Sequence, residues 1–257
     1  MIDRKGTILL VLAFLLTLAL SGCSGPVTST SAQPTPTPTP NPSATGLIER
    51  HVQFKQVDYP FWIFLPSAYD GTHVLPAILL VHGAGGNGPD FLNAWRDFAE
   101  KNGIILVAPT VPDGVDFELN VVPQLYPMIM DTARGEWLID PRRIYLFGVS
   151  AGGYTVFDAG LPDSQYFAAG GVFAAVITPD FDFLLQKATR KIPLALYIGD
   201  HDEFFTLAQA QRTVDVLDAD GFKVHFVVFP GLDHNYGAVA AQVNADVWNF
   251  FGQASLP

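Results

Sequence analysis

Residues 144–153 read IYLFGVSAGG and combine the pattern of a buried strand with that of a sharp turn. Residues 144–147 are all aliphatic or aromatic, which is typical of a strand covered on both faces. Ser150 follows, between Gly148 and Gly152. A serine on a tight turn from strand to helix needs such small neighbours, because larger side chains would collide with the strand and the helix. The stretch therefore predicts a strand, a turn that exposes Ser150, and a helix.

The same alternation of apolar runs and helical spacing extends over the chain on both sides of this stretch. We expect strands at 48–57, 61–65, 77–81, 104–108, 143–147, 168–174, 194–198 and 223–229. We expect helices at 89–102, 123–138, 151–159, 179–189, 206–220 and 237–251, and a turn at 58–60. Strands that alternate with single helices predict an α/β fold, with a mostly parallel, doubly wound sheet and helices on both of its faces.

Three more clusters of polar or glycine residues directly follow predicted strands. They are residues 82–86 (HGAGG), 199–203 (GDHDE) and 231–234 (GLDH). In open α/β sheets, ligands bind at the carboxyl ends of the strands. We therefore expect these loops to gather around Ser150 at one edge of the sheet.

The loops hold the residue types of a serine nucleophile and its base. A serine hydroxyl is a weak nucleophile until a base takes its proton, and an imidazole base needs a carboxylate to fix its tautomer. His234 is the expected base. Asp233 is its neighbour in sequence and would rarely fold back to reach it, while Asp200 lies at the strand end. Asp202 stands farther into the loop and is the favoured carboxylate, with Asp200 as the alternative.

The glycine-rich loop 82–86 can direct backbone N–H groups at a developing negative charge. We expect the N–H groups of Ala84 and Ala151 to form an oxyanion hole. His82 is expected to orient the loop rather than to act as the base. The alternative is a phosphate-binding loop, but the Lys-Ser/Thr ending of that motif is missing.

The domain from 47 to 257 resembles the α/β-hydrolase superfamily. The residues that carry the resemblance are 80–86 (LVHGAGG), 139–153 (IDPRRIYLFGVSAGG), Gly199-x-x-Asp202 and Gly231-x-x-His234. Their chain order, Ser then Asp then His, is the order found in that superfamily. Within it, the chain is most similar to secreted esterases of the polyhydroxybutyrate-depolymerase and feruloyl-esterase type and to small carboxylesterases.

This resemblance implies ester hydrolysis by Ser150, His234 and Asp202 through an acyl-enzyme, with no cofactor and no metal. It also implies little or no cap domain, since the predicted strands near 176 and 192 are close in sequence. Two other functions stay open: a serine peptidase of the prolyl-oligopeptidase type, and a non-catalytic surface-binding lipoprotein on a hydrolase scaffold. Five aromatic residues near the loops could line a site or belong to the core, namely Trp95, Phe117, Tyr154, Phe204 and Tyr236.

The composition excludes several other classes of function. Hydrophobic residues make up 49% of the 257 residues and charged residues 15%, as in a folded domain with a core. The net charge of −11, from 14 basic and 25 acidic residues, argues against binding to nucleic acid, whose phosphates require basic surfaces. The single cysteine allows no intrachain disulfide. The oligomeric state is not predicted.

The N-terminal segment resembles a bacterial lipoprotein signal peptide. Residues 1–22 contain two basic residues and then an apolar run that is too short to span a membrane. The sequence LSGC follows at residues 20–23, which places Cys23 at the position of a lipidated cysteine. Residues 23–46 are rich in Ser, Thr and Pro and predict an extended linker. We therefore expect a lipid-anchored protein of the bacterial cell envelope that faces outside the cytoplasm.

Overall fold

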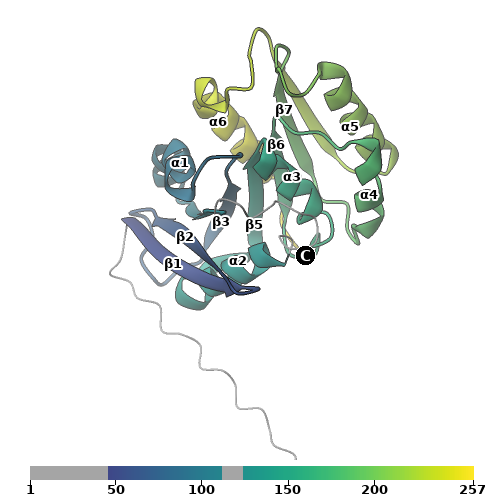
Figure 1. Cartoon of the computed structure of the whole chain (residues 1–257). Coiled ribbons are helices and arrows are strands. Elements are labelled where there is room, and N and C mark those ends of the chain that lie inside the picture. Colours follow the sequence, from purple (N-terminus) through teal and green to yellow (C-terminus); the bar gives the residue numbers. More distant parts are fainter. Residues whose placement is uncertain (1–45, 112–123) are drawn as a thin grey trace, which may run out of the picture. The chain divides into compact units, whose positions relative to one another are not determined.

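The computed structural model describes residues 46–111 and 124–257, in which eight strands form one sheet (Figure 1). The strands are β1 (Gly46–Phe54), β2 (Val57–Leu65), β3 (Leu75–Val81), β4 (Ile105–Pro109), β5 (Ile139–Val149), β6 (Ala169–Phe173), β7 (Leu194–Gly199) and β8 (Val224–Phe229). Their order in the sheet is β1-β2-β4-β3-β5-β6-β7-β8. β2 is antiparallel to β1 and β4, and all other neighbours are parallel. The mostly parallel sheet is confirmed.

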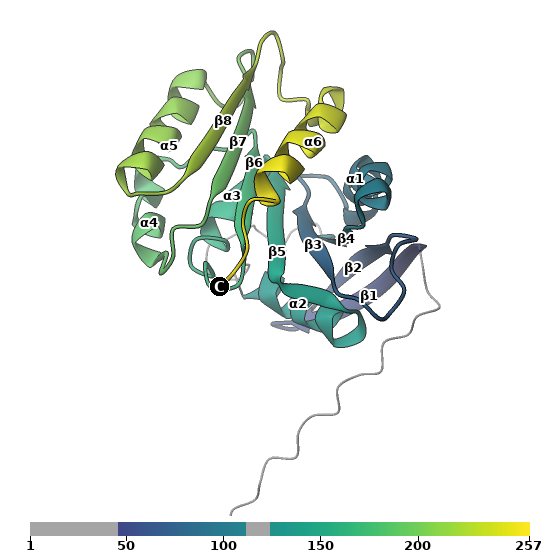
Figure 2. The ribbon, with the colours of Figure 1, turned by 180° about the vertical axis from the view of Figure 1, so that it is seen from behind.

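Helices cover both faces of this sheet. They are α1 (Gly88–Asn102), α2 (Leu125–Glu136), α3 (Ala151–Asp158), α4 (Phe183–Lys187), α5 (Leu207–Ala219) and α6 (Ala240–Phe251), with the short 3-10 helices η1 (Pro179–Phe181) and η2 (Tyr236–Ala238). α1 and α6 share one apolar core with the sheet, and α2, α3, α4 and α5 share the other. Figure 1 is seen from the side of α3 and Figure 2 from the side of α6. The doubly wound arrangement is therefore confirmed.

The first hairpin turns earlier than the sequence predicts. The expected turn at 58–60 is wrong, because those residues lie inside β2. Lys55 and Gln56 form the turn instead, with φ of 48° and 66°, and Phe54 pairs with Val57. Two consecutive residues with positive φ match the twist of a tight hairpin. Because neither of them is Gly or Asn, the usual sequence signal for this turn is missing.

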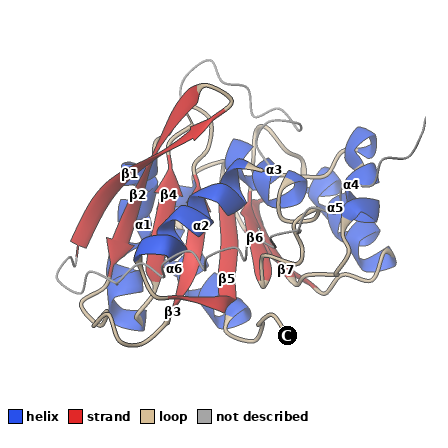
Figure 3. Ribbon diagram, turned by 90° about the horizontal axis from the view of Figure 1, so that it is seen from below, coloured by secondary structure: helices blue, strands red, loops and turns tan. Residues whose placement is uncertain are grey.

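The other predicted elements are present with shifted ends, and two predicted helices are each divided. The helix expected at 179–189 consists of η1 and α4, and the helix expected at 237–251 consists of η2 and α6. η1 and α4 are also the only helices between β6 and β7, a stretch that the structure describes in full. Little chain is therefore available there for a cap. Figure 3 shows β1 and β2 at one end of the sheet and α4 and α5 at the other.

The N-terminal predictions lie outside the described residues. These are the signal peptide at 1–22, the lipidated Cys23 and, up to Thr45, the linker. In the two described ranges, no helix has both the length and the apolar character needed to cross a membrane.

Candidate active site

Ser150 occupies a strained turn between β5 and α3. Its backbone has φ 55° and ψ −119°, which is unusual for a residue with a side chain. Two backbone hydrogen bonds hold it there: the Ser150 N–H donates to the Phe173 carbonyl at 2.9 Å, and the Ser150 carbonyl accepts from the Gly153 N–H at 2.8 Å. Non-glycine residues with such backbone angles cluster at functional sites.

The glycines around Ser150 are required by close backbone contacts. A Cβ atom at Gly148 would lie 2.0 Å from the Gly152 carbonyl oxygen, and one at Gly152 would lie 2.1 Å from the Val81 carbonyl oxygen. Both distances are far inside van der Waals contact. The turn can therefore form only with glycine at these two positions, which is the physical reason for the Gly-x-Ser-x-Gly pattern.

The loop after β3 lies directly beside Ser150. A Cβ atom at Gly83 would be 3.3 Å from the Ser150 Cβ, and Ala84 lines the same cleft as Ser150. Ala151 is the first residue of α3. The first N–H groups of a helix have no partner within the helix, and they carry its positive end. The N–H group of Ala151 is therefore well suited to bind an anion next to Ser150, and the oxyanion role of the Ala84 N–H stays a prediction.

His82 is buried and holds the loop rather than facing the cleft. Only 4% of the residue is exposed. Its Nδ1 lies 2.7 Å from the Gly83 carbonyl oxygen, to which it donates, and its Nε2 accepts from the Val111 N–H at 3.1 Å. Because Nε2 accepts a hydrogen bond, the ring is neutral, and burial lowers the pKa of His82 in the same direction. Both ring nitrogens are thus engaged in fixing the loop.

The structure brings Asp202 and His234 together. His234 Nδ1 lies 2.7 Å from Asp202 Oδ2, and the Asp202 side chain is fully buried. The other oxygen, Oδ1, accepts from the N–H groups of Phe204 and Phe205, both at 2.9 Å. Three contacts therefore orient this carboxylate toward the imidazole. His234 and Ser150 line one cleft of about 450 Å³, as a base and its nucleophile must.

Two other acidic residues join the Asp202 loop to the His234 loop. Asp200 Oδ1 accepts from the Gly231 N–H at 2.6 Å, and Glu203 Oε2 accepts from the His234 N–H at 3.1 Å. Asp233 bonds locally, to the N–H of Asn235. Sequence reasoning missed the role of Glu203, for which the pattern held no signal. In the part of the chain that the structure describes, no group of three or more ligating side chains could hold a metal ion.

The five aromatic candidates fall into different environments. Phe204 is 66% exposed, and its ring centroid lies 4.7 Å from that of His234. Phe204 lines the cleft, whereas Trp95 and Tyr236 are buried in the core. Tyr154 lines a separate cavity. Phe117 lies outside the described residues.

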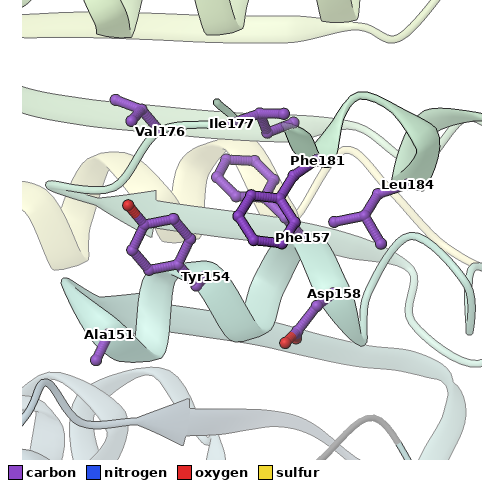
Figure 4. A pocket seen from close by; sticks show the side chains of 8 residues that line it. All are labelled: Ala151, Tyr154, Phe157, Asp158, Val176, Ile177, Phe181 and Leu184. Carbon is purple, nitrogen blue, oxygen red and sulfur yellow. The ribbon is translucent and has the colours of Figure 1, made fainter. Parts of the chain in front are cut away.

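The separate cavity that Tyr154 lines has a volume of about 230 Å³, and we call it the α3 cavity (Figure 4). Its lining residues are Ala151, Tyr154, Phe157, Asp158, Val176, Ile177, Phe181 and Leu184. Asp158 is only 4% exposed, and its Oδ1 has no hydrogen-bond partner among the described residues. Burial raises the pKa of Asp158 to about 7. For Asp158 the sequence gives one indication of its place: helical spacing puts it on the same face of α3 as Ala151 and Tyr154.

We expect Asp158→Asn to stabilise the protein more at pH 8 than at pH 5. A folded pKa of about 7, above the ordinary 3.8, means that ionised Asp158 destabilises the fold. The loss in free energy of unfolding that ionised Asp158 causes is absent below roughly pH 4 and grows up to about pH 7. It reaches on the order of 4 kcal/mol at pH 8. Calorimetric Tm values of the wild type and Asp158→Asn at pH 5 and pH 8 measure this difference in stabilisation. Asp218→Asn, at an exposed position, is the control. A change in Tm that is equal at both pH values would contradict the burial argument.

A comparison with known proteins adds a distant likeness in sequence. No protein-family model matches the chain. Over 142 residues, which are 53% of the chain, it is 28% identical to a bifunctional acetylxylan esterase/xylanase of Neocallimastix patriciarum. The match covers 20% of that protein, so the chain spans about a fifth of the length of this relative.

The likeness to solved structures is broader. A thermostable esterase superposes with a TM-score of 0.67 at 20% identity, over 81% of this chain and 63% of that one. Esterase 2 of Thermogutta terrifontis, in a form phosphorylated by paraoxon, superposes with a TM-score of 0.67 at 16% identity, over 81% of this chain and 94% of that one. Likeness at such identities establishes a shared fold.

Proposed function

We propose that this chain, which has the α/β-hydrolase fold, is a serine ester hydrolase. The observation that carries the proposal is the arrangement in the cleft. Ser150, on its strained turn, shares the cleft with His234, and Nδ1 of His234 contacts the buried carboxylate of Asp202. These are the parts of an activated serine nucleophile, in the chain order that this fold uses.

The reaction begins when Ser150 Oγ attacks the ester carbonyl carbon while His234 Nε2 accepts the hydroxyl proton. The N–H groups of Ala84 and Ala151 bind the oxyanion of the tetrahedral intermediate. His234 then donates its proton to the leaving alcohol oxygen, and the acyl group remains on Ser150. Throughout, Asp202 keeps a proton on Nδ1 and stabilises the imidazolium.

Deacylation repeats these steps with water in place of the serine hydroxyl. His234 takes a proton from water as the oxygen attacks the acyl carbonyl. Collapse of the second intermediate breaks the bond to Ser150 Oγ, which recovers its proton from His234, and the carboxylic acid leaves. The mechanism uses groups of this chain and water alone.

Hydrolysis of a substrate panel separates this proposal from its rivals. The panel holds p-nitrophenyl acyl esters, feruloyl esters, acetylated sugars and peptide amides. The esterase names of the relative and of the solved structures favour the esters. Hydrolysis of amides alone would favour a serine peptidase of the prolyl-oligopeptidase type. No hydrolysis, with no labelling by a fluorophosphonate, would favour a non-catalytic binding protein.

We also propose that a lipid on Cys23 anchors the enzyme in the bacterial cell envelope. The short apolar run before LSGC supports this, and the linker at 23–46 provides a spacer. Each buried CH₂ of an acyl chain contributes ~0.8 kcal/mol, so more than one chain gives stable attachment.

We expect the full chain, made in a bacterium, to fractionate with membranes and to incorporate a labelled fatty acid. Cys23→Ala should abolish the incorporation and alter the processing, because the thiol that carries the lipid is gone. A shortened chain that begins at Gly46 is the control and should stay in the soluble fraction. A mature N-terminus other than Cys23, without lipid, would refute the anchor.

A further inference from the structure

The α3 cavity runs along one helix face away from Ser150. Ala151, Tyr154 and Asp158 line it at spacings of three and four residues, which places them on one face of α3. Seven residues at 1.5 Å per residue separate the two ends of this wall by about 10 Å. Figure 4 shows the segment from Val176 to Leu184 as the opposite wall. The cavity is therefore a slot with one end beside the nucleophile.

The α3 cavity and the cleft have a common border. Ser150 lines the cleft, and the next residue, Ala151, lines the cavity. The ring of Tyr154 in the cavity wall packs against the ring of Phe205 in the cleft wall, with centroids 5.9 Å apart. The two spaces therefore lie side by side at Ser150 and Ala151, with this ring pair between parts of their walls.

The chemistry of the acyl-enzyme decides which part of an ester faces the α3 cavity. The leaving oxygen must lie near His234, which donates its proton, and the carbonyl oxygen must lie at the N–H groups of Ala84 and Ala151. The remaining substituent of the carbonyl carbon, the acyl chain, then points away from His234. His234 lines the cleft and Ala151 lines the cavity. The α3 cavity, whose wall begins at Ala151, is the apolar space next to Ser150 that His234 does not line.

We infer that the α3 cavity is the acyl-binding pocket and that it selects apolar acyl groups larger than acetyl. This inference rests on the proposed ester hydrolysis. The walls are mostly aliphatic and aromatic, with Val176 1% and Ile177 2% exposed. A volume of about 230 Å³ holds roughly seven or eight groups of water size, at ~30 Å³ each. The methyl group of an acetyl ester would leave most of this space unused.

Asp158 is compatible with an apolar occupant. Its carboxyl is buried and neutral in mildly acidic solution, since burial raises the pKa of Asp158 to about 7. A neutral carboxyl in the wall costs an apolar chain far less than a carboxylate would.

The test is kcat/KM for p-nitrophenyl acetate, butyrate, hexanoate, octanoate and dodecanoate. Burial of a methylene is worth up to about a fourfold gain in kcat/KM, so the value should rise from acetate until the acyl group fills the cavity near octanoate. Leu184→Phe, which narrows the cavity, should lower octanoate hydrolysis at least about tenfold while acetate hydrolysis stays within about twofold. Phe181→Ala should move the optimum to longer chains.

Phe183→Ala is the matched control. Phe183 is 43% exposed on α4 and is absent from the cavity wall, so the chain-length profile should not change. If Leu184→Phe fails to fold, Phe181→Ala still tests the same wall. Efficient hydrolysis of acetate that falls with chain length, with both cavity variants acting equally on all esters, would overturn the pocket and leave the esterase intact. Failure of the wild type to hydrolyse any ester would overturn the esterase itself.

Discussion

Ser150→Ala should abolish fluorophosphonate labelling and lower kcat for an ester such as p-nitrophenyl butyrate by about 10⁵-fold or more. Ser150 carries the only hydroxyl group among the described residues that line the cleft, so loss of Oγ removes the serine acyl-enzyme route. In a serine protease, loss of the nucleophile costs on the order of 10⁶ in kcat. The oxyanion hole would remain, since its N–H groups belong to the backbone, and would sustain the residual rate.

The folded state should survive this substitution. Ala keeps the Cβ atom at the strained turn, and the backbone bonds to Phe173 and Gly153 do not involve the serine side chain. The readouts are burst kinetics, covalent labelling followed by mass spectrometry, and circular dichroism. Ser255→Ala, at an exposed position near the C-terminus, is the control and should behave as wild type. Unchanged turnover in Ser150→Ala would refute the serine-hydrolase proposal.

Much of the fold is predictable because its signals are local. The apolar run at 144–147 and the glycines around Ser150 require a strand and a tight turn whatever the rest of the chain does. The first hairpin is different. Its turn at Lys55 and Gln56 depends on the pairing of β1 with β2, and the residues themselves disfavour positive φ. Tertiary pairing overrides local preference there.

The candidate site likewise has one part that the sequence predicts and one part that it does not. Ser150 and His234 each follow a strand, and a sheet with parallel strands brings such positions to one edge. The α3 cavity is not predictable, because its walls come from α3 and from the segment between β6 and β7. Only the packed structure reveals the space that these segments leave between them.

The choice between Asp200 and Asp202 also required the structure. The end of β7 touches the loop after β8, since a Cβ atom at Gly199 would lie 2.0 Å from the Leu232 carbonyl oxygen. Beyond this contact, Asp202 bonds to His234 and Asp200 to the Gly231 N–H. Both carboxylates thus join the two loops, and only Asp202 contacts the imidazole.

We therefore expect Asp202→Asn to lower kcat by about 10⁴-fold and Asp200→Asn by less than about tenfold. At position 202, the Asn carbonyl oxygen can accept the two N–H bonds that Oδ1 accepts now, from Phe204 and Phe205. The amide NH₂ then takes the place of Oδ2 and donates to His234 Nδ1. The imidazole is forced to carry its proton on Nε2, where it cannot accept the proton of Ser150.

Asp200→Asn has no such consequence. The Asn carbonyl oxygen still accepts from the Gly231 N–H, so the two loops stay joined and the tautomer of His234 is unaffected. Initial rates on one p-nitrophenyl ester, with thermal melts of both variants, measure the contrast, and Asp233→Asn adds a third aspartate from the same loops as a control. Because both main variants replace a carboxylate by an amide of the same shape, loss of charge in the loops affects them alike. A dead Asp200→Asn beside an active Asp202→Asn would assign the orienting carboxylate to Asp200 and contradict the geometry at His234.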